Sequence, residues 1–204
     1  MSLYSALRPL AALLMHTLIP TRYVRGERLD SLEAPYILIA NHQTLLDPVP
    51  VAARVRRYEV HFLGKKEITR FRPVKWFVTK LHMIPVDRGH ADMEAMRACM
   101  KVVRDGGVLG IFPEGTRKVE GTMEHIESGV SLIALRAGVP LIPLYVQGKF
   151  KPFHRVRVTV GDPIPLDDLR ADGVNADTAA RLNARITETY RRMAAEAENR
   201  PDEK

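Results

Sequence analysis

The sequence predicts a single α/β domain with a largely parallel central sheet flanked by helices, plus an N-terminal amphipathic helix. Short apolar, β-rich runs alternate with longer segments of helical period, the order typical of parallel sheets. The apolar runs lack polar alternation, as expected for strands covered on both faces. A length of 204 residues and a hydrophobic share of 46% suffice for one core and exclude a disordered chain. We divide the chain into the helix at 1–22 and the domain at 23–204.

The N-terminal segment is apolar but interrupted. Arg8 and Pro9 break residues 3–19, and the remaining apolar run has about half of the roughly 20 residues that a membrane-spanning helix needs. A secretory signal would need a small-residue cleavage site, and residues 17–21 (Thr-Leu-Ile-Pro-Thr) are a poor one. The sequence predicts an amphipathic helix and leaves two alternatives open: packing on the domain or lying in a membrane interface.

Six β-rich runs are predicted as strands. Continuous apolar segments, of the length typical of buried strands, occupy residues 36–40, 108–112 and 141–146. Shorter or more mixed runs predict weaker strands over residues 60–63, 83–86 and 156–160.

Helices are predicted between these runs from their start and stop signals. Asp47 before Pro48 is typical of an N-cap followed by the first helical position. Asp92 is a second candidate N-cap, and Gly138 is a candidate helix end. The predicted helices span residues 47–57, 92–105, 129–137 and 176–197. The last has a core-facing stripe formed by Leu182, Ile186, Tyr190 and Met193.

Basic residues are concentrated in one segment. The chain has a formal net charge of +7, and residues 54–88, with ten Lys or Arg and three acidic residues, account for all of it. Such a concentration favours an anionic partner: a phosphate-bearing ligand, nucleic acid or an anionic lipid surface. The alternative is a solvated face with no partner.

Metal ligands do not cluster in the sequence. Cys99 is the single cysteine, which excludes a disulfide scaffold and a multi-cysteine metal site, and it is predicted as a small apolar core residue. The Asp and His residues do not recur at ligand spacings. We therefore expect no metal site and no bound cofactor.

The first candidate for catalysis follows the strand at 36–40. A loop begins there with His42, and Asp47 lies five residues later, at the start of a predicted helix. Ligands of open α/β sheets bind beyond the carboxyl ends of strands. An imidazole whose second nitrogen contacts a carboxylate is a suitable general base, because the carboxylate fixes the tautomer and stabilises the imidazolium. We predict His42 as the base and Asp47 as its partner.

The same His-to-Asp spacing occurs a second time, at His82 and Asp87. About 0.4 matches are expected by chance in a chain of this composition, so spacing alone is a weak signal. The residues between His82 and Asp87 are predicted to be a strand, whose five extended steps span about 16 Å. The two side chains are then too far apart to pair, and His82 is predicted to be a partly buried residue near the mouth of the site.

The second candidate follows the strand at 108–112, with the sequence Phe-Pro-Glu-Gly-Thr-Arg at 112–117. A glycine beside a hydroxyl and a guanidinium allows close backbone approach to an oxyanion and bidentate binding of phosphate by Arg117. The alternative is a structural pair of Arg117 with Glu114 across a turn.

Together these two segments resemble motifs of the glycerolipid acyltransferases, among them the bacterial 1-acylglycerol-3-phosphate O-acyltransferases. The six-residue run at 112–117 would arise by chance in about one of a few hundred thousand such chains. Two further blocks occupy the family's order: Lys66-Glu67-Ile68 with residues 84–89, and residues 139–143. The resemblance covers roughly residues 23–160.

The resemblance implies transfer of an acyl group from a thioester of acyl carrier protein or coenzyme A to the free hydroxyl of lysophosphatidic acid. It assigns His42 as general base and Asp47 as its orienting carboxylate. The residues implied to bind the substrate phosphate are Lys66, Arg88 and Arg117, and those implied to shape the acceptor site are Glu114, Gly115, Thr116 and Pro143. Since neither a Ser-His-Asp set nor a reactive cysteine is present, direct attack without an acyl-enzyme is the simpler scheme.

The chain departs from the family pattern at two places. His82 occupies a position that is commonly glycine, so the local backbone or the acceptor contacts are expected to differ. Residues 125–128 (His-Ile-Glu-Ser) stand where a lysine is frequent. That departure bears on any phosphate or donor contact made from this turn, and so on the identity of the acceptor.

An enzyme with a lipid substrate is expected to contact a membrane, and residues 71–80 are the candidate segment. They interleave cations with aromatic rings and contain the only tryptophan of the sequence. Such a mixture suits a membrane interface, where each nearby cation contributes about 1 kcal/mol on anionic lipid. The predicted contacts are Phe71, Lys75, Trp76 and Phe77, and the alternative places Trp76 and Phe77 in the core. With the N-terminal helix, this segment predicts peripheral attachment to the cytoplasmic face of the cell membrane.

Other functions stay open at this stage. The acceptor could be another lysophospholipid or a lipid without phosphate, or the chain could be a non-catalytic lipid-binding protein. A nucleic-acid-binding module would fit the pI near 9.7, but the basic residues occupy one segment without a recognisable reading helix. The expected partners are therefore lysophosphatidic acid, an acyl carrier protein or coenzyme A thioester and an anionic membrane surface, and not nucleic acid.

Overall fold

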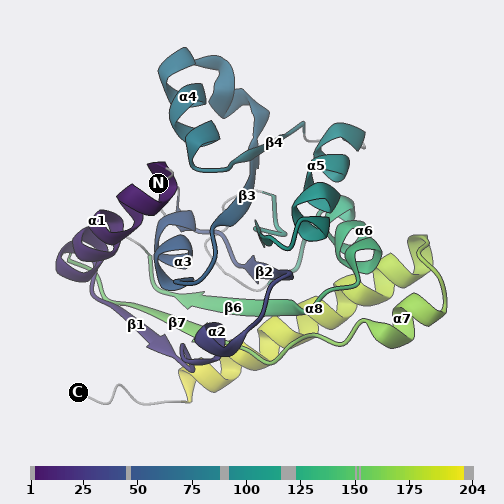
Figure 1. Cartoon of the computed structure of the whole chain (residues 1–204). Helices are drawn as coiled ribbons and strands as arrows, with labels where there is room; N and C mark the ends of the chain where they lie inside the picture. Colours follow the sequence, from purple (N-terminus) through teal and green to yellow (C-terminus); the bar gives the residue numbers. More distant parts are fainter. Residues whose placement is uncertain are drawn as a thin grey trace.

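The computed structural model describes residues 3–44, 47–87, 92–115, 123–149, 151 and 153–199. These residues form a seven-stranded sheet with helices on both faces (Figure 1). The strands are β1 (Thr21–Val24), β2 (Tyr36–Ala40), β3 (Val60–Lys65), β4 (Ile84–Val86), β5 (Val108–Ile111), β6 (Leu141–Gln147) and β7 (Val156–Val160). The helices are α1 (Leu3–Leu18), α2 (Arg28–Ser31), α3 (Pro48–Arg54), the 3-10 helix η1 (Lys66–Arg70), α4 (Arg72–Lys80), α5 (Met93–Arg104), α6 (Ser128–Ala137), α7 (Asp167–Ala171) and α8 (Ala176–Glu198).

The strand order is β1-β7-β6-β2-β5-β3-β4. Every neighbouring pair is parallel except β6 with β7. The connection between β6 and β7 is only eight residues long, which suits an antiparallel return, whereas parallel neighbours need a longer crossover. The predicted α/β fold with a largely parallel sheet is confirmed.

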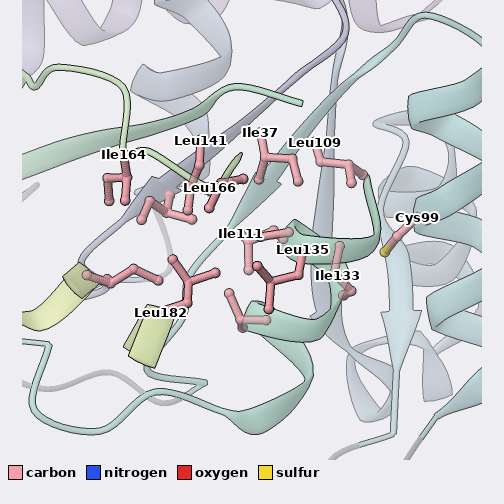
Figure 2. Close-up of a cluster of buried hydrophobic side chains, with 14 of the residues drawn as sticks. Ile37, Cys99, Leu109, Ile111, Ile133, Leu135, Leu141, Ile164, Leu166 and Leu182 are labelled. Atoms are coloured by element: carbon pink, nitrogen blue, oxygen red, sulfur yellow. The ribbon is translucent and has the colours of Figure 1, made fainter. Parts of the chain in front are cut away.

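The buried strand β2 divides the core into two layers. Its five residues are all buried, and their side chains alternate between the faces of the sheet. Ile37 and Ile39 belong to the cluster under α5, α6 and α8, part of which Figure 2 shows. Leu38 and Ala40 belong to the opposite cluster, which includes residues of α2 and α3. Cys99 is fully buried in the first cluster, as predicted, and burial raises the pKa of its thiol to about 12.

The predicted strands and helices all form, and two of the predicted end signals have the expected geometry. The carboxylate of Asp92 accepts a hydrogen bond from the backbone N–H of Ala95, 2.9 Å away, at the start of α5. Gly138 ends α6 in the left-handed region at φ +60°. One boundary is wrong: α3 ends at Arg54 instead of Arg57, because Val55 is extended and buried in the core.

Part of the basic segment is used inside the domain. Arg54 pairs with Asp30 at 2.7 Å, and Arg57 pairs with Glu33 at 2.8 Å. The anionic partners of these two cations are carboxylates of the same chain, and the two pairs join the α3 region to residues 30–33. Other cations of the segment lie exposed on η1 and α4, at Lys66, Arg70, Arg72, Lys75 and Lys80.

Helix α1 packs on the domain through one face and exposes another. Tyr4 is buried, its hydroxyl accepts a hydrogen bond from the backbone N–H of Val60, and Arg8 donates to the carbonyl of Arg56 at 2.7 Å. Leu10 and Leu13 are more than half exposed on its other side. Packing on the domain is thus correct for one face of the predicted amphipathic helix. Within the described residues, no helix is both long and apolar enough to span a bilayer.

The segment with interleaved cations and aromatic rings forms η1 and α4, which the sequence analysis did not predict as helices. Helix α4 packs mainly on η1 and projects from the sheet at the top of Figure 1. Phe71 is 67% exposed and Trp76 is 59% exposed, so Trp76 is not a core residue. The side chain of Phe77 lies outside the described part of the structure.

Candidate active site

The carboxyl ends of four adjacent parallel strands meet at one edge of the sheet. The loop after β2 contains His42, and the loop after β5 contains Glu114. Lys66 follows β3, and Asp87 follows β4. Parallel strands place their carboxyl ends together, so segments distant in the sequence converge here, as the sequence analysis expected.

His42 and Asp47 form a hydrogen-bonded pair at this edge. Nδ1 of His42 lies 2.8 Å from Oδ2 of Asp47. The carboxylate is fully buried, while the imidazole is 13% exposed. A carboxylate only accepts hydrogen bonds, so this contact places the proton on Nδ1 and the lone pair on Nε2.

Asp47 is held by the loop that it closes. Its carboxylate accepts hydrogen bonds from the backbone N–H groups of Gln43 at 2.6 Å and Thr44 at 2.9 Å, and from the Thr44 hydroxyl at 2.6 Å. Burial acts to raise the pKa of Asp47, but these bonds and the one from His42 outweigh it and lower the pKa below its ordinary value. The carboxylate is therefore ionised at neutral pH.

The prediction that Asp47 caps the following helix with its side chain is wrong. Asp47 precedes α3 and Pro48 is the first helical residue, as predicted, but the Asp47 carboxylate makes no capping hydrogen bond to α3. It points back to residues 42–44, because those N–H groups and the imidazole compete for the same oxygens. The side chain orders the loop at residues 42–44 instead of the helix.

The imidazole also rests on an aromatic ring. The ring centroids of His42 and Phe112 are 4.5 Å apart at an interplanar angle of 31°, and Phe112 stacks in turn on Phe62 at 5.9 Å. These two phenylalanines come from β3 and from the end of β5. They restrict rotation of the imidazole out of its contact with Asp47.

Glu114 is a second buried carboxylate in the site. It is 1% exposed, and its Oε2 accepts a hydrogen bond from the backbone N–H of His42 at 3.1 Å. The family resemblance implies a place for Glu114 in the acceptor site but does not predict this bond to His42. The only sequence signal for it is an acidic residue at a strand end, where a solvated carboxylate is equally plausible.

The turn after Glu114 requires glycine. Gly115 has φ +63°, and a Cβ atom built there would lie 2.6 Å from the side chain of Glu127. The backbone N–H of Glu127 donates to the carbonyl of Pro113 at 2.9 Å. The departure noted at residues 125–128 therefore places a glutamate, in place of a lysine, directly against this turn.

Asn41 joins the ends of β2 and β6. Its carboxamide accepts from the backbone N–H of Val146 at 2.7 Å and donates to the carbonyl of the same residue at 2.9 Å. Gln43 donates to that carbonyl as well, at 3.1 Å. His42 is thus flanked by two side chains anchored to β6.

Three of the predicted site residues, Arg88, Thr116 and Arg117, lie outside the described residues. The alternative pairing of Arg117 with Glu114 therefore stays a prediction. The two described residues that flank residues 88–91 contact each other. The carboxylate of Asp92 accepts a hydrogen bond from the backbone N–H of Asp87, 2.8 Å away. Arg88 thus follows a residue fixed at the same edge of the sheet.

The remaining predicted residues occupy two different places. Lys66 is exposed at the start of η1, on the edge that contains His42. Pro143 lies inside β6, paired with Ile39, and its carbonyl accepts from the backbone N–H of Gly161. The structure brings Lys66 to the edge and leaves Pro143 within the sheet, three residues before the β6 segment that Asn41 contacts.

His82 is partly buried, as predicted, but it does not lie at the mouth of the site. Its Nε2 is 2.8 Å from Glu59, and its ring is 4.8 Å from that of His61, near the start of β3. The start of β3 is the end of the strand opposite to the edge that contains His42. His82 has φ +59°, a left-handed conformation that favours glycine, which explains why glycine is common at this position in the family.

Comparison with known proteins decides the family. A family model described as Acyltransferase matches residues 21–147. The chain belongs to the acyltransferase family. The matched region of this acyltransferase contains His42, Asp47 and Glu114, and it ends at the last residue of β6.

Relatives and a solved structure agree with this assignment. The chain is 27% identical over 177 residues to the 1-acyl-sn-glycerol-3-phosphate acyltransferase of Bacillus subtilis, covering 84% of this chain and 85% of that protein. It is 26% identical over 200 residues to the protein of the same name from Streptococcus pneumoniae, covering 95% and 74%. The crystal structure of the 1-acyl-sn-glycerophosphate (LPA) acyltransferase PlsC from Thermotoga maritima shares the fold, with a TM-score of 0.71 at 21% identity, covering 98% of this chain and 80% of that one.

Proposed function

We propose that this acyltransferase transfers an acyl group from a thioester of acyl carrier protein or coenzyme A to the sn-2 hydroxyl of 1-acyl-sn-glycerol 3-phosphate, giving phosphatidic acid for phospholipid biosynthesis. The observation that carries the proposal is the 2.8 Å contact between Nδ1 of His42 and Asp47, which leaves Nε2 to accept a proton. The printed names of the Bacillus and Streptococcus relatives support the choice of acceptor.

In the proposed reaction, Nε2 of His42 removes the proton of the sn-2 hydroxyl while the hydroxyl oxygen attacks the thioester carbonyl carbon. The carbon–sulfur bond of the tetrahedral intermediate then breaks, and the leaving thiolate receives the proton from the imidazolium. Asp47 keeps its charge throughout and stabilises the imidazolium. The scheme needs no acyl-enzyme, metal or bound cofactor, and a general base supplies about 10²–10⁴-fold.

The acceptor is tested with a panel of lipids. We expect thiol release from palmitoyl-CoA or palmitoyl-acyl carrier protein to depend on 1-acyl-sn-glycerol 3-phosphate. Lysophosphatidylcholine tests another lysophospholipid, and monoacylglycerol tests a lipid without phosphate. Equal rates with monoacylglycerol would contradict a phosphate-binding acceptor site. Binding without turnover of any acceptor would favour the non-catalytic alternative.

The phosphate of the acceptor is proposed to bind Arg88 and Arg117, with Lys66 at the same edge of the sheet, and Glu114, Gly115 and Thr116 to form the wall beside it. Replacing Arg88 by alanine is expected to raise the acceptor KM about tenfold or more with a smaller change in kcat, because phosphate is bound equally in the ground and transition states. Steady-state kinetics at varied acceptor concentration measure this. Arg136→Ala, at an exposed position on α6, is the matched control and should leave KM unchanged.

Attachment to an anionic membrane is proposed to use the exposed face of α1 and the η1–α4 segment, with Phe71, Lys75, Trp76 and Phe77 at the interface. Two exposed aromatic side chains beside exposed cations support this. The protein would then be peripheral, on the cytoplasmic face.

The paired variant Trp76→Ala with Lys75→Ala is expected to lower the partition coefficient on phosphatidylglycerol vesicles, measured by sedimentation, by more than about tenfold, since about 1 kcal/mol for the cation and the burial of the ring are lost. Neutral phosphatidylcholine vesicles should bind the wild type less. Arg136→Ala again serves as the control. Equal sedimentation of the paired variant and the wild type would reject α4 as a membrane contact.

A further inference from the structure

A tyrosine of the C-terminal helix reaches the strands from which the catalytic loop begins. Tyr190 lies in α8, which crosses under the sheet in Figure 1, and it is fully buried. Its hydroxyl lies 2.7 Å from the carbonyl oxygen of Ile39 and 3.2 Å from that of Leu144. The sequence pattern predicts Tyr190 only as part of an apolar stripe, where a phenylalanine would pack equally well.

The two carbonyls lie where the ladder between β2 and β6 ends. Leu144 pairs with Ala40, the last residue of β2, and Ile39 directly precedes it. Beyond this point, the Asn41 carboxamide replaces the strand ladder by bonding both backbone groups of Val146. The Tyr190 hydroxyl thus contacts the chain where this ladder ends, three residues before His42.

Tyr190 also lies near the second buried carboxylate of the site. Burial raises the pKa of the Tyr190 hydroxyl well above its ordinary value, and the charge of Glu114 adds to the rise. The hydroxyl therefore keeps its proton and remains a donor across the working pH range. Glu114 in turn accepts a hydrogen bond from the backbone N–H of His42. The preceding residue, Asn41, bonds to Val146 of β6, so Glu114 and β6 both hold the chain where it leaves β2.

We propose that Tyr190 is a positioning residue for the general base: through its hydroxyl, α8 fixes the end of the ladder between β2 and β6 and so the place of His42 relative to Asp47 and the acceptor. The family model ends at residue 147, so the proposal adds a part of the chain outside the matched region to the active site. The kinetic test of this role for Tyr190 rests on the proposed function. The position of the His42 ring can be measured without substrate.

The test compares two tyrosines that each lose only a hydroxyl. Tyr190→Phe removes the donor to Ile39 and Leu144. Tyr36→Phe is the matched control, because Tyr36 is equally buried, starts β2 and has a hydroxyl without a hydrogen-bond partner among the described residues. Met193→Ala is a second control, which loosens the packing of α8 against Gly161 and retains the Tyr190 hydroxyl. Each variant of the full chain is assayed at the same interval below its own Tm.

For Tyr190→Phe we expect kcat to fall about tenfold with the KM of both substrates nearly unchanged, because a small displacement of the base slows chemistry without weakening binding. The Nδ1 proton resonance of His42, assigned by its absence in His42→Ala, should move in Tyr190→Phe and stay in place in Tyr36→Phe. Met193→Ala should lower Tm more than Tyr190→Phe does, while its kcat stays at the wild-type value.

Three results would overturn the proposal: wild-type kcat together with an unmoved His42 resonance in Tyr190→Phe, a fall in kcat in Met193→Ala as large as in Tyr190→Phe, or loss of the fold in Tyr190→Phe. If the wild type shows no turnover with lysophosphatidic acid, the proposed function fails. The His42 resonance then decides the role of Tyr190 alone.

Discussion

Replacing His42 by alanine is expected to reduce kcat by at least about 10³-fold. The imidazole is the group at the catalytic edge whose Nε2 is left to accept a proton, since Asp47 engages Nδ1 at 2.8 Å. General-base catalysis supplies about 10²–10⁴-fold, and the ring also fixes the position of the attacking hydroxyl. Trapping of released thiol, with saturating thioester and lysophosphatidic acid, measures the loss.

The control for this variant is His82→Ala. His82 has the same spacing to an aspartate, but it contacts Glu59 and His61 near the start of β3. We expect His82→Ala to retain turnover, with any loss appearing in Tm. More than about a tenth of wild-type kcat in His42→Ala would reject His42 as the base, because a loss below tenfold is smaller than general-base catalysis supplies.

Replacing Asp47 by asparagine is expected to lower kcat by about 10²–10³-fold while His42 is still present. An asparagine amide can donate to Nδ1, and the imidazole proton then moves to Nε2, where it blocks proton transfer from the hydroxyl. Acceptor KM should change little, since Asp47 is fully buried and reaches the substrate only through His42. Steady-state kinetics at varied acceptor concentration separate the change in kcat from any change in the acceptor KM. Asp162→Asn, in an exposed pair with Arg28, is the matched control and should keep wild-type kcat.

Asp47 also makes stability depend on pH. Its pKa is lowered in the folded protein, so the unfolded chain binds more protons as the pH falls toward that pKa. The stabilisation from the ionised carboxylate is complete above the ordinary range of aspartate and is lost as pH falls through the lowered pKa. Asp47→Asn should cost about 1–3 kcal/mol at pH 7 through unmet hydrogen bonds.

Thermal melts across pH 3 to 8 test this stability effect. The difference in Tm between wild type and Asp47→Asn should be largest at neutral pH and begin to shrink near pH 4, where the Asp47 carboxyl of the unfolded chain takes up a proton while that of the folded protein is still ionised. A difference in Tm that does not change with pH would show that the ionised carboxylate is not the source of the stabilisation.

Local sequence patterns were sufficient to predict an element wherever the burial of its own residues or a cap within the same helix determines the structure. The apolar run Tyr36–Ala40 predicts a strand covered on both faces, which the structure confirms. Asp92 caps α5 through a hydrogen bond from Ala95, three residues away, so no distant residue is needed. The weakest predictions concerned polar groups with several possible partners. Asp47 is the example: the sequence predicts its carboxylate both as the cap of the following helix and as the partner of His42, and in the structure it contacts residues 42–44 and makes no capping bond.

The sequence by itself determined the class of fold, the strands that form its centre and the pair of His42 with Asp47, because hydrophobic runs and a five-residue loop are local properties. Only the tertiary structure decided that His82 faces Glu59, that Trp76 is exposed and that the Tyr190 hydroxyl reaches the carbonyl of Ile39, 151 residues away. Such contacts depend on which elements pack together. The spacing of residues along the chain does not contain that information.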